Sequence, residues 1–322
     1  MKFLTTPSEF YQRLLTGITQ ATRQIVISTL YIGPEQSELI KALETRANAG
    51  VFVKLIMDAN RGTRDACPHV QLDLRSPHTF RLPTSRLREA VGTYHAKFAV
   101  MDDTVIVTGA NLSDTYFTNR QDRYVVFEDA ELAHKLANEL YDPPRWNISH
   151  NTKDTVVETL LTNANKDSHI YLSSPYMNIS PEIFVLLEKF NHVTLITGSE
   201  ECNAFKNAKG LAKYVPAAYE SFKQDLPPNC QLWEYSRPGW SFHAKGIWVN
   251  DNKNWSTVIG SSNLGYRSRV RDIELSMLIK NDSEKIQKDF ENISKWCRKI
   301  DRIERVNLFV GFLAKGPFRS FL

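Results

Sequence analysis

Two short stretches of the chain combine residue types that can perform chemistry on a phosphate ester. The first, YHAKFAVMDD, holds His95 and Lys97, and the second, FHAKGIWVND, holds His243 and Lys245. A phosphodiester centre needs a nucleophile, and neutral imidazole is one near pH 7. It also needs a second proton carrier for the leaving group and for an incoming alcohol. One histidine from each stretch would supply both functions.

An asparagine and a carboxylate follow each stretch at matching distances. Asn111 and Asn263 each come after a predicted strand, and Asp122 and Glu274 each stand eleven residues further on. The lysines and amides can offer positive charge and hydrogen bonds to non-bridging phosphate oxygens. A carboxylate can fix the tautomer of an imidazole. Histidine, lysine, asparagine and carboxylate thus recur in one order, which two unrelated core histidines would not produce.

The elements that must position these groups alternate between helix and strand. In the first half, helix, strand, helix and strand are predicted for residues 8–22, 24–31, 35–49 and 51–57, with Ser8 as the first N-cap and Gly50 after the second helix. After the Pro-Pro pair at 143–144 the same series is predicted for residues 153–165, 169–174, 181–190 and 192–197. This alternation is typical of an α/β fold with a mostly parallel or mixed sheet.

Two landmarks repeat at nearly the same spacing, which predicts a duplicated domain. Tyr31 in ISTLYIG corresponds to Tyr176 in LSSPYMN, an offset of 176 − 31 = 145. The two HAK triplets are offset by 243 − 95 = 148. With 322 residues the chain suits two domains of ordinary size. We expect them at residues 1–150 and 151–304, followed by an apolar tail at 305–322.

The composition excludes some classes of protein and leaves others open. Hydrophobic content of 42% and charged content of 24% are those of a globular protein, not of a disordered or collagen-like one. A net charge of +4 suits a polyanion, an anionic lipid surface or a phosphorylated substrate equally well. No run of 18 apolar residues predicts a membrane-spanning helix. The four cysteines lack zinc-site spacing and fit idle thiols: Cys67, Cys202, Cys230 and Cys297.

The two stretches resemble the paired H-x-K-x4-D motifs of the phospholipase D superfamily. Within it the chain is similar to the family of mitochondrial CDP-diacylglycerol–glycerol-3-phosphate 3-phosphatidyltransferases. The closer match is carried by LYIG near the start, GANLSDTYFTNRQDRY after motif one, FHAKG at motif two and GSSNLGYRSRVRDIE after it. The resemblance implies two tandem phospholipase D-like domains related by a pseudo-twofold axis, each a mixed sheet flanked by helices.

The resemblance also assigns roles to the motif residues. Motif one is complete in His95, Lys97 and Asp102, whereas motif two has Asn250 at the position of Asp102. This departure makes the two halves unequal, so His95 is expected to be the nucleophile and His243 the general acid and base. These expected catalytic residues act together with Lys245, Asn111 and Asn263.

In the superfamily the carboxylate that orients each histidine tends to come from the opposite half. We therefore expect Glu274 to pair with His95, and Asp122 to pair with His243. This pairing places the reaction centre between the two halves.

The reaction that the resemblance implies has two steps. His95 attacks the lipid-side phosphorus of CDP-diacylglycerol and CMP leaves, so that a phosphatidyl-histidine remains. The primary hydroxyl of sn-glycerol 3-phosphate then attacks it and releases phosphatidylglycerophosphate. No metal cofactor is required, because two lysines offset the phosphate charge, although a divalent cation at the pyrophosphate is left open. The family resemblance places the protein peripherally on the matrix side of the mitochondrial inner membrane.

A phosphorylated acceptor calls for cationic side chains near the site. The arginines after the two motifs and in DANRG are candidates, although each taken singly also fits a solvated surface charge. Two tyrosines at strand ends would line the pocket or pack in the core. The expected substrate-binding residues are Arg61, Arg120, Arg123, Arg269, Arg271, Tyr31 and Tyr176.

A diacyl substrate requires contact with an anionic membrane surface. The C-terminal stretch VNLFVGFLAKGPFRSFL is apolar but interrupted by Lys315, Pro317 and Arg319, so it suits an interface better than a span. Packing of this tail on its own domain is the alternative. A nuclease of the same superfamily would show a basic stripe with interleaved aromatics, and we expect no nucleic acid partner. A cardiolipin- or phosphatidylserine-synthase-like transferase with another acceptor stays a closer alternative.

Overall fold

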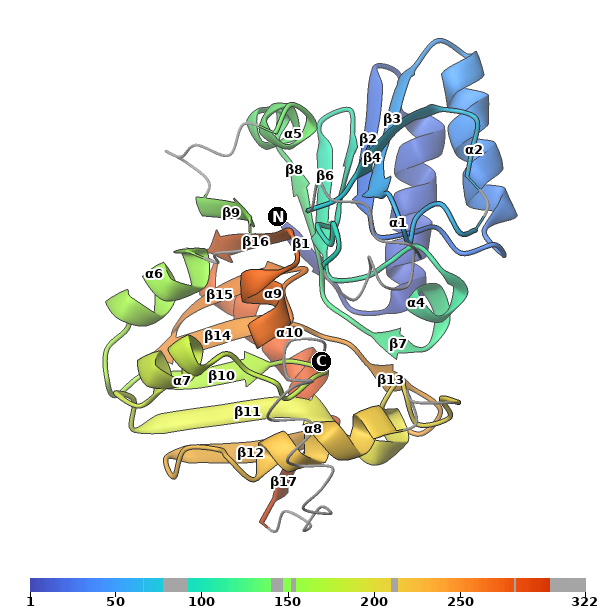
Figure 1. Cartoon of the computed structure of the whole chain (residues 1–322). Helices are drawn as coiled ribbons and strands as arrows, with labels where there is room; N and C mark the ends of the chain where they lie inside the picture. Colours follow the sequence, from blue (N-terminus) through green and yellow to red (C-terminus); the bar gives the residue numbers. More distant parts are fainter. Residues whose placement is uncertain are drawn as a thin grey trace.

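Two mixed β-sheets, each flanked by helices, form the body of the protein in this computed structural model (Figure 1). The predicted α/β fold of two related halves is therefore confirmed. The predicted membrane tail at residues 305–322 lies outside the described part of the chain. The structure describes residues 1–65, 67–77, 92–139, 147–151, 155–209, 214–280 and 282–301. Among these residues, no helix combines the length and the apolar character needed to cross a membrane.

The first sheet has seven strands in the order β1-β8-β6-β5-β2-β3-β4. Only β2, β3 and β4 run parallel to one another, and the remaining pairs are antiparallel. The strands are β1 (Lys2–Leu4), β2 (Gln24–Thr29), β3 (Phe52–Asp58), β4 (Gln71–Arg75), β5 (Phe98–Met101), β6 (Thr104–Thr108) and β8 (Tyr124–Glu128). The helices of this half are α1 (Pro7–Gln20), α2 (Ser37–Asn48), α4 (Asp114–Thr118) and α5 (Ala130–Ala137).

The second sheet repeats this order strand for strand and adds β17 at one edge, reading β9-β16-β15-β14-β10-β11-β12-β17. Its strands are β9 (Asn147–Asn151), β10 (His169–Ser173), β11 (His192–Gly198), β12 (Cys230–Tyr235), β14 (Gly246–Asp251), β15 (Asn254–Gly260), β16 (Glu274–Ile279) and β17 (Cys297–Ile300). The helices are α6 (Thr155–Asn163), α7 (Pro181–Leu187), α8 (Val215–Lys223), α9 (Tyr266–Val270) and α10 (Ser283–Ser294). The predicted boundary at residue 150 falls inside β9, so the second sheet begins at Asn147.

The first helix shows how local sequence sets an element. Thr6 is the N-cap: its side chain accepts from the N–H of Glu9 at 3.2 Å, and the Glu9 carboxylate accepts from the N–H of Thr6 at 3.4 Å. This reciprocal pair is a capping box. The predicted N-cap, Ser8, is therefore wrong by two positions, because it lies within the first turn. Apolar residues at helical spacing, including Phe10, bury one face of α1 in the core of the first half.

The two halves share one hydrophobic core as well as having cores of their own. Val26 and Val100 from the first sheet belong to the same buried cluster as Trp248 and Met277 from the second sheet. A short two-stranded sheet also joins the halves, with β7 (Arg120–Gln121) parallel to β13 (Ser241–Phe242). Because packed interiors deform little, the relative position of the halves is well fixed.

Candidate active site

His95 is held by the opposite half of the chain through its backbone and its ring. Its N–H donates to the carbonyl oxygen of Ile273 at 2.8 Å. Its Nδ1 lies 2.8 Å from Oε2 of the next residue, Glu274, which also accepts from the Ser261 hydroxyl at 2.5 Å. The predicted pairing of His95 with Glu274 is therefore confirmed.

His243 is held in the same way from the other side. Its N–H donates to the carbonyl oxygen of Gln121 at 2.8 Å, and its Nδ1 lies 2.6 Å from Oδ2 of Asp122. The predicted pairing of His243 with Asp122 is confirmed as well. In each half, therefore, two consecutive residues of a strand region bind the motif histidine of the other half.

Burial and charge set the protonation of the His95 pair. Burial lowers the pKa of His95, with a contribution from the charge of Lys97. Burial raises the pKa of Glu274, but the bonds from His95 and Ser261 outweigh it and hold that pKa below its usual range. A carboxylate accepts only, so Nδ1 of His95 carries the hydrogen and Nε2 presents its lone pair. This is the state of a nucleophilic imidazole.

Among the described residues, the ring of His243 has a hydroxyl contact that the ring of His95 does not have. The hydroxyl of Tyr116 lies 3.1 Å from Nε2 of His243, and the amide nitrogen of Asn111 donates to that hydroxyl at 3.2 Å. Burial, followed by the charge of Lys245, lowers the pKa of His243 well below its usual value. Burial raises the pKa of Asp122 to about 6. Tyr116 was missed by the sequence analysis, although it lies inside the family-like segment GANLSDTYFTNRQDRY.

The two motif lysines are completely buried beside the histidines. Nζ of Lys97 donates to the carbonyl oxygen of His95 at 2.6 Å, and Nζ of Lys245 donates to that of His243 at 3.0 Å. Burial lowers the pKa of Lys97 to about 7 and that of Lys245 to about 8. A bound phosphate would favour the charged form of both, which suits them to neutralise non-bridging oxygens.

The two motif asparagines leave polar atoms for a ligand. The side-chain oxygens of Asn111 and Asn263 are buried and have no hydrogen-bond partner among the described residues. Buried polar groups without a partner are rare in folded proteins. These oxygens only accept, so they suit a ligand that donates a hydrogen bond. Donation from the amide nitrogens to a phosphate oxygen stays a prediction, and one hydrogen of the Asn111 amide is already donated to Tyr116.

Asp102, expected to be catalytic, has a structural role at the far end of β5 from His95. Its carboxylate accepts from the N–H groups of Thr22, Arg23 and Gln24 at 2.8, 2.8 and 3.0 Å. These bonds give partners to the backbone N–H groups between α1 and the start of β2. The other contacts of the carboxylate, with the Thr22 hydroxyl at 3.1 Å and the Arg23 guanidinium at 3.9 Å, belong to the same segment. The expectation of a catalytic role is therefore wrong, because every bond that the side chain forms with the described residues goes to residues 22–24 and none to the reaction centre.

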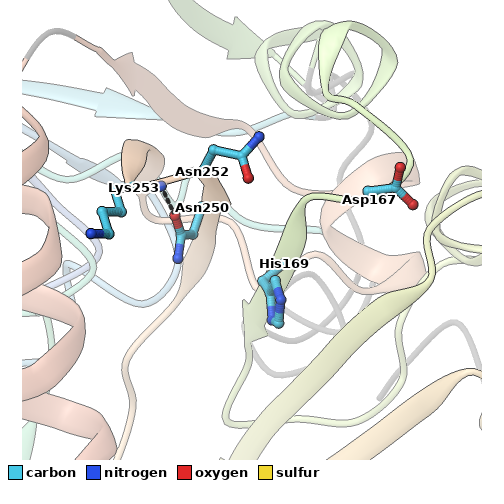
Figure 2. Close-up of a pocket in the computed structure, with 5 residues that line it drawn as sticks. All are labelled: Asp167, His169, Asn250, Asn252 and Lys253. Atoms are coloured by element: carbon cyan, nitrogen blue, oxygen red, sulfur yellow. Dashed lines mark hydrogen bonds between the residues drawn. The ribbon is translucent and has the colours of Figure 1, made fainter.

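Asn250 occupies the equivalent position in the second half and binds differently. Its side-chain oxygen accepts from the N–H of Lys253 at 2.9 Å, within its own turn. Figure 2 shows it turned toward Lys253, in a pocket that Asp167 and His169 also line. In the loop before β10, a residue of the loop itself accepts a backbone hydrogen bond: the side-chain oxygen of Asn165 accepts from the N–H of Asp167 at 3.1 Å. The departure of motif two thus changes a loop and not the reaction centre.

Arg123, expected to bind substrate, fastens the two halves together. Its guanidinium forms an ion pair with Asp289 at 2.7 Å and donates to the carbonyl oxygens of Lys245 and Val258 and to the hydroxyl of Thr257. All five of its N–H donors are engaged in these bonds. The expectation is therefore wrong, because no donor remains for a phosphate.

Gly246 in FHAKG leaves the space that the Arg123 guanidinium occupies. It has φ of +125°, and a Cβ there would lie 2.4 Å from Nη1 of Arg123 and 2.2 Å from the carbonyl oxygen of Val258. Only glycine fits both constraints. Part of the closer family resemblance is thus explained by packing.

Arg120 lies beside the His243 pair. Its guanidinium carbon is 4.5 Å from the centre of the Tyr116 ring, and its Nε donates to the Ser241 hydroxyl at 3.0 Å. No carboxylate among the described residues forms an ion pair with it. Its charge is therefore not compensated by a carboxylate of the described residues, and substrate binding by Arg120 stays a prediction.

The two expected tyrosines take different positions. Tyr176 meets the ring of His243 edge to face, with ring centres 6.3 Å apart. Tyr31 lies under the guanidinium of Arg61 at 3.7 Å, and Arg61 also pairs with Asp65 at 2.7 Å. Tyr176 thus borders the reaction centre, while a role of Tyr31 and Arg61 in substrate binding stays a prediction.

The arginines after motif two, which were expected to bind substrate, form their bonds within the second half of the protein. Arg269 pairs with Glu158 of α6 at 2.5 Å, so its charge is already compensated by the protein. Arg271 ends α9, where its N–H donates to the carbonyl oxygen of Arg267 at 2.9 Å. Substrate binding by either stays a prediction. In the described part of the chain, no three His, Cys, Asp or Glu side chains are grouped so as to hold a metal ion.

Comparison with known proteins agrees with this geometry. Residues 14–142 match the family described as cardiolipin synthase, PLD-like domain. Over 89% of its length the chain is 27% identical to a protein of Gallus gallus, of which it covers 75%, and 26% identical over the same shares to one of Homo sapiens. Both are named CDP-diacylglycerol--glycerol-3-phosphate 3-phosphatidyltransferase, mitochondrial.

The fold of the whole chain matches that of a solved structure. The crystal structure of phosphatidylserine synthase from Haemophilus influenzae Rd KW20 superimposes with a TM-score of 0.77, covering 100% of this chain and 95% of that one at 19% identity. At that identity the match shows the fold alone. The resemblance predicted from the motifs is confirmed.

Proposed function

We propose that this protein transfers the phosphatidyl group of CDP-diacylglycerol to sn-glycerol 3-phosphate and releases CMP. The observation that carries the proposal is a pair of buried histidines, each bonded to a carboxylate of the opposite half and each flanked by a buried lysine. The relatives that align with most of this chain bear the name of that transferase. Their names support both the donor and the acceptor.

In the proposed first step, Nε2 of His95 attacks the lipid-side phosphorus. The bond from that phosphorus to the CMP oxygen breaks, and a phosphatidyl-histidine forms. Lys97 and Lys245 stabilise the charge on the non-bridging oxygens. The CMP phosphate needs little protonation to leave, because its second pKa is about 6. Neutral His95 with its lone pair on Nε2 supports this assignment.

In the proposed second step, the primary hydroxyl of the acceptor attacks the phosphatidyl-histidine and His95 leaves. The hydroxyl must lose a proton, which the His243 pair accepts. Arg120 lies on the same side and has no carboxylate partner among the described residues, so it suits the phosphate of the acceptor. A phosphorylated acceptor is favoured over serine or another neutral alcohol for this reason.

The proposal includes where the reaction occurs and what it needs. A diacyl donor requires a membrane surface, so we place the protein peripherally on the mitochondrial inner membrane, at the matrix side. The word mitochondrial in the names of the relatives supports the compartment. The mechanism uses lysines for charge and needs no metal ion, although a divalent cation would assist binding of the pyrophosphate. No step involves nucleic acid.

The test is to incubate the purified protein with CDP-diacylglycerol in mixed micelles, with and without sn-glycerol 3-phosphate. We expect CMP release and phosphatidylglycerophosphate formation that depend on the acceptor, and both should disappear in His95→Ala. Serine as acceptor and a DNA substrate serve as controls. Lipid product formed with serine but not with glycerol 3-phosphate would show that serine is the acceptor. Cleavage of DNA without CMP release under any metal condition would overturn the proposed transferase activity.

A further inference from the structure

The hydroxyl of Tyr116 stands where a proton must pass in the second step. Nδ1 of His243 lies 2.6 Å from Oδ2 of Asp122 and 2.6 Å from Nζ of Lys245, which is also 3.2 Å from Nε2. A carboxylate only accepts, so Nδ1 carries the hydrogen toward Asp122 and Nε2 carries the lone pair. Asn111 donates to the oxygen of Tyr116 at 3.2 Å, which leaves the hydroxyl hydrogen to be donated to Nε2 at 3.1 Å. The bonds therefore run in one direction, from Asn111 through Tyr116 and His243 to Asp122.

The other half of the site lacks this group. Tyr116 stands five residues after Asn111, and the residue five positions after Asn263 is Ser268. The hydroxyl of Ser268 is turned to the N–H of Asn263 at 3.3 Å. No described residue forms a hydrogen bond with Nε2 of His95. The duplicated fold thus leaves one histidine open to attack phosphorus and covers the other with a phenol.

Burial and a nearby cation act in opposite directions on the pKa of the Tyr116 hydroxyl, and burial is the larger effect. Its ring is buried, and burial raises the pKa of the phenol. Arg120 over the ring opposes that effect, because its positive charge stabilises the phenolate. The ring meets His243 edge to face at 5.0 Å between centres, which fixes the direction of the hydroxyl. A phenol held between a cation and an imidazole can both give and receive a proton.

We propose that Tyr116 carries the proton of the acceptor alcohol to His243. The inference rests on the proposed transferase function and deepens it. As the acceptor oxygen bonds to phosphorus and the bond from phosphorus to Nε2 of His95 breaks, the alcohol proton passes to the Tyr116 oxygen. The Tyr116 proton passes at the same time to Nε2 of His243. The imidazolium formed is paired with Asp122 and releases its proton to solvent after the product leaves.

The test separates the two half-reactions in the purified protein of residues 1–322. Exchange of labelled CMP into CDP-diacylglycerol without acceptor reports the first step alone, and phosphatidylglycerophosphate formation reports both. For Tyr116→Phe we expect exchange within about threefold of wild type and transfer lowered about 100-fold. Tyr11→Phe is the matched control, because it removes a hydroxyl that bonds to Glu38 on the surface of α1 and α2.

The outcomes distinguish the relay from a purely structural hydroxyl. Equal loss of exchange and transfer in Tyr116→Phe would show that Tyr116 only holds the site together. Full transfer in that variant would show that His243 takes the proton directly. Either result overturns the relay while leaving the transferase intact. Absence of both reactions in the wild-type protein would instead overturn the proposed function.

Discussion

Glu274 binds the imidazole of His95 from 179 residues further along the chain, and the residue before it binds the backbone of the same histidine. The arrangement is repeated in the opposite sense by Asp122 and His243. Neither half of the protein therefore contains a complete reaction centre. The duplication gives one site for two domains, because each domain completes the other.

We expect Glu274→Gln to lower CMP exchange about 1,000-fold. Glutamine can donate to Nδ1 of His95, which would stabilise the tautomer with its hydrogen on Nε2. Nε2 then has no lone pair with which to attack phosphorus. The measurement is exchange of labelled CMP at pH 7. Glu284→Gln on α10, an exposed position that pairs with Lys288, serves as the control and should match wild type. Retention of exchange in Glu274→Gln would show that this carboxylate does not orient the nucleophile.

Asp102→Asn should cost stability and spare the chemistry. The carboxylate of Asp102 accepts three backbone N–H groups, and an amide cannot accept all of them, so we expect a loss of about 1–3 kcal/mol in the free energy of unfolding. The pKa of Asp102 is lowered in the folded state, so its contribution is present at pH 7 and lost as pH falls through that pKa. Urea unfolding and initial rates measure the two effects. A large fall in kcat in fully folded protein would contradict the structural role.

Arg123→Lys and Arg120→Lys should separate a structural arginine from a ligand-binding one. Lysine cannot replace the five bonds of buried Arg123, so we expect a loss of about 3–5 kcal/mol in unfolding free energy. Arg120→Lys should leave stability unchanged and raise the KM for glycerol 3-phosphate about tenfold, because a bidentate contact is lost. Chemical denaturation and acceptor titration check both. A KM effect in Arg123→Lys together with a stability loss in Arg120→Lys would show that Arg123 binds the acceptor and Arg120 is structural.

The pH dependence of kcat/KM should be bell-shaped with a maximum between pH 6 and 7. Asp122, with a pKa of about 6, must be ionised to hold His243, so activity is lost as pH falls through 6. Lys97 and Lys245 must be protonated to bind phosphate, so activity is lost as pH rises through their pKa values of about 7 and 8. Because kcat/KM reports the free enzyme, kcat should fall only at higher pH. A flat profile up to pH 9 would show that both lysines stay charged in the free protein.

Lys97→Met should remove a pH dependence of stability while abolishing activity. The pKa of Lys97 is about 7 in the folded protein, and the model-compound value of 10.5 applies when it is unfolded. The unfolded chain therefore binds more protons between these values, so stability rises with pH by up to about 1.4 kcal/mol per pH unit from this group. Thermal unfolding of both proteins at pH 6.5 and pH 8.5 measures the difference. Parallel slopes would mean that Lys97 is not buried as a titrating group.

The sequence by itself determined the elements and the chemistry. Apolar periodicity placed the helices and strands within a few residues, because helix and strand bury their faces at fixed spacings. The repeated order of histidine, lysine, asparagine and carboxylate predicted that the chain contains the same domain fold twice. The pairing across the halves was expected from the family resemblance, and the bonds of His95 and His243 confirm it.

Only the tertiary structure decided what individual polar residues do. Arg123 looked like a phosphate ligand until its partner, Asp289, was found 166 residues away, and Asp102 looked catalytic until its carboxylate was seen to bind the loop before β2. Tyr116 was not singled out from the sequence, yet its hydroxyl lies 3.1 Å from Nε2 of His243. The type of a side chain states which bonds it can form. Which of those bonds it forms depends on the groups that folding brings within 3 Å of it, and these come from distant parts of the chain.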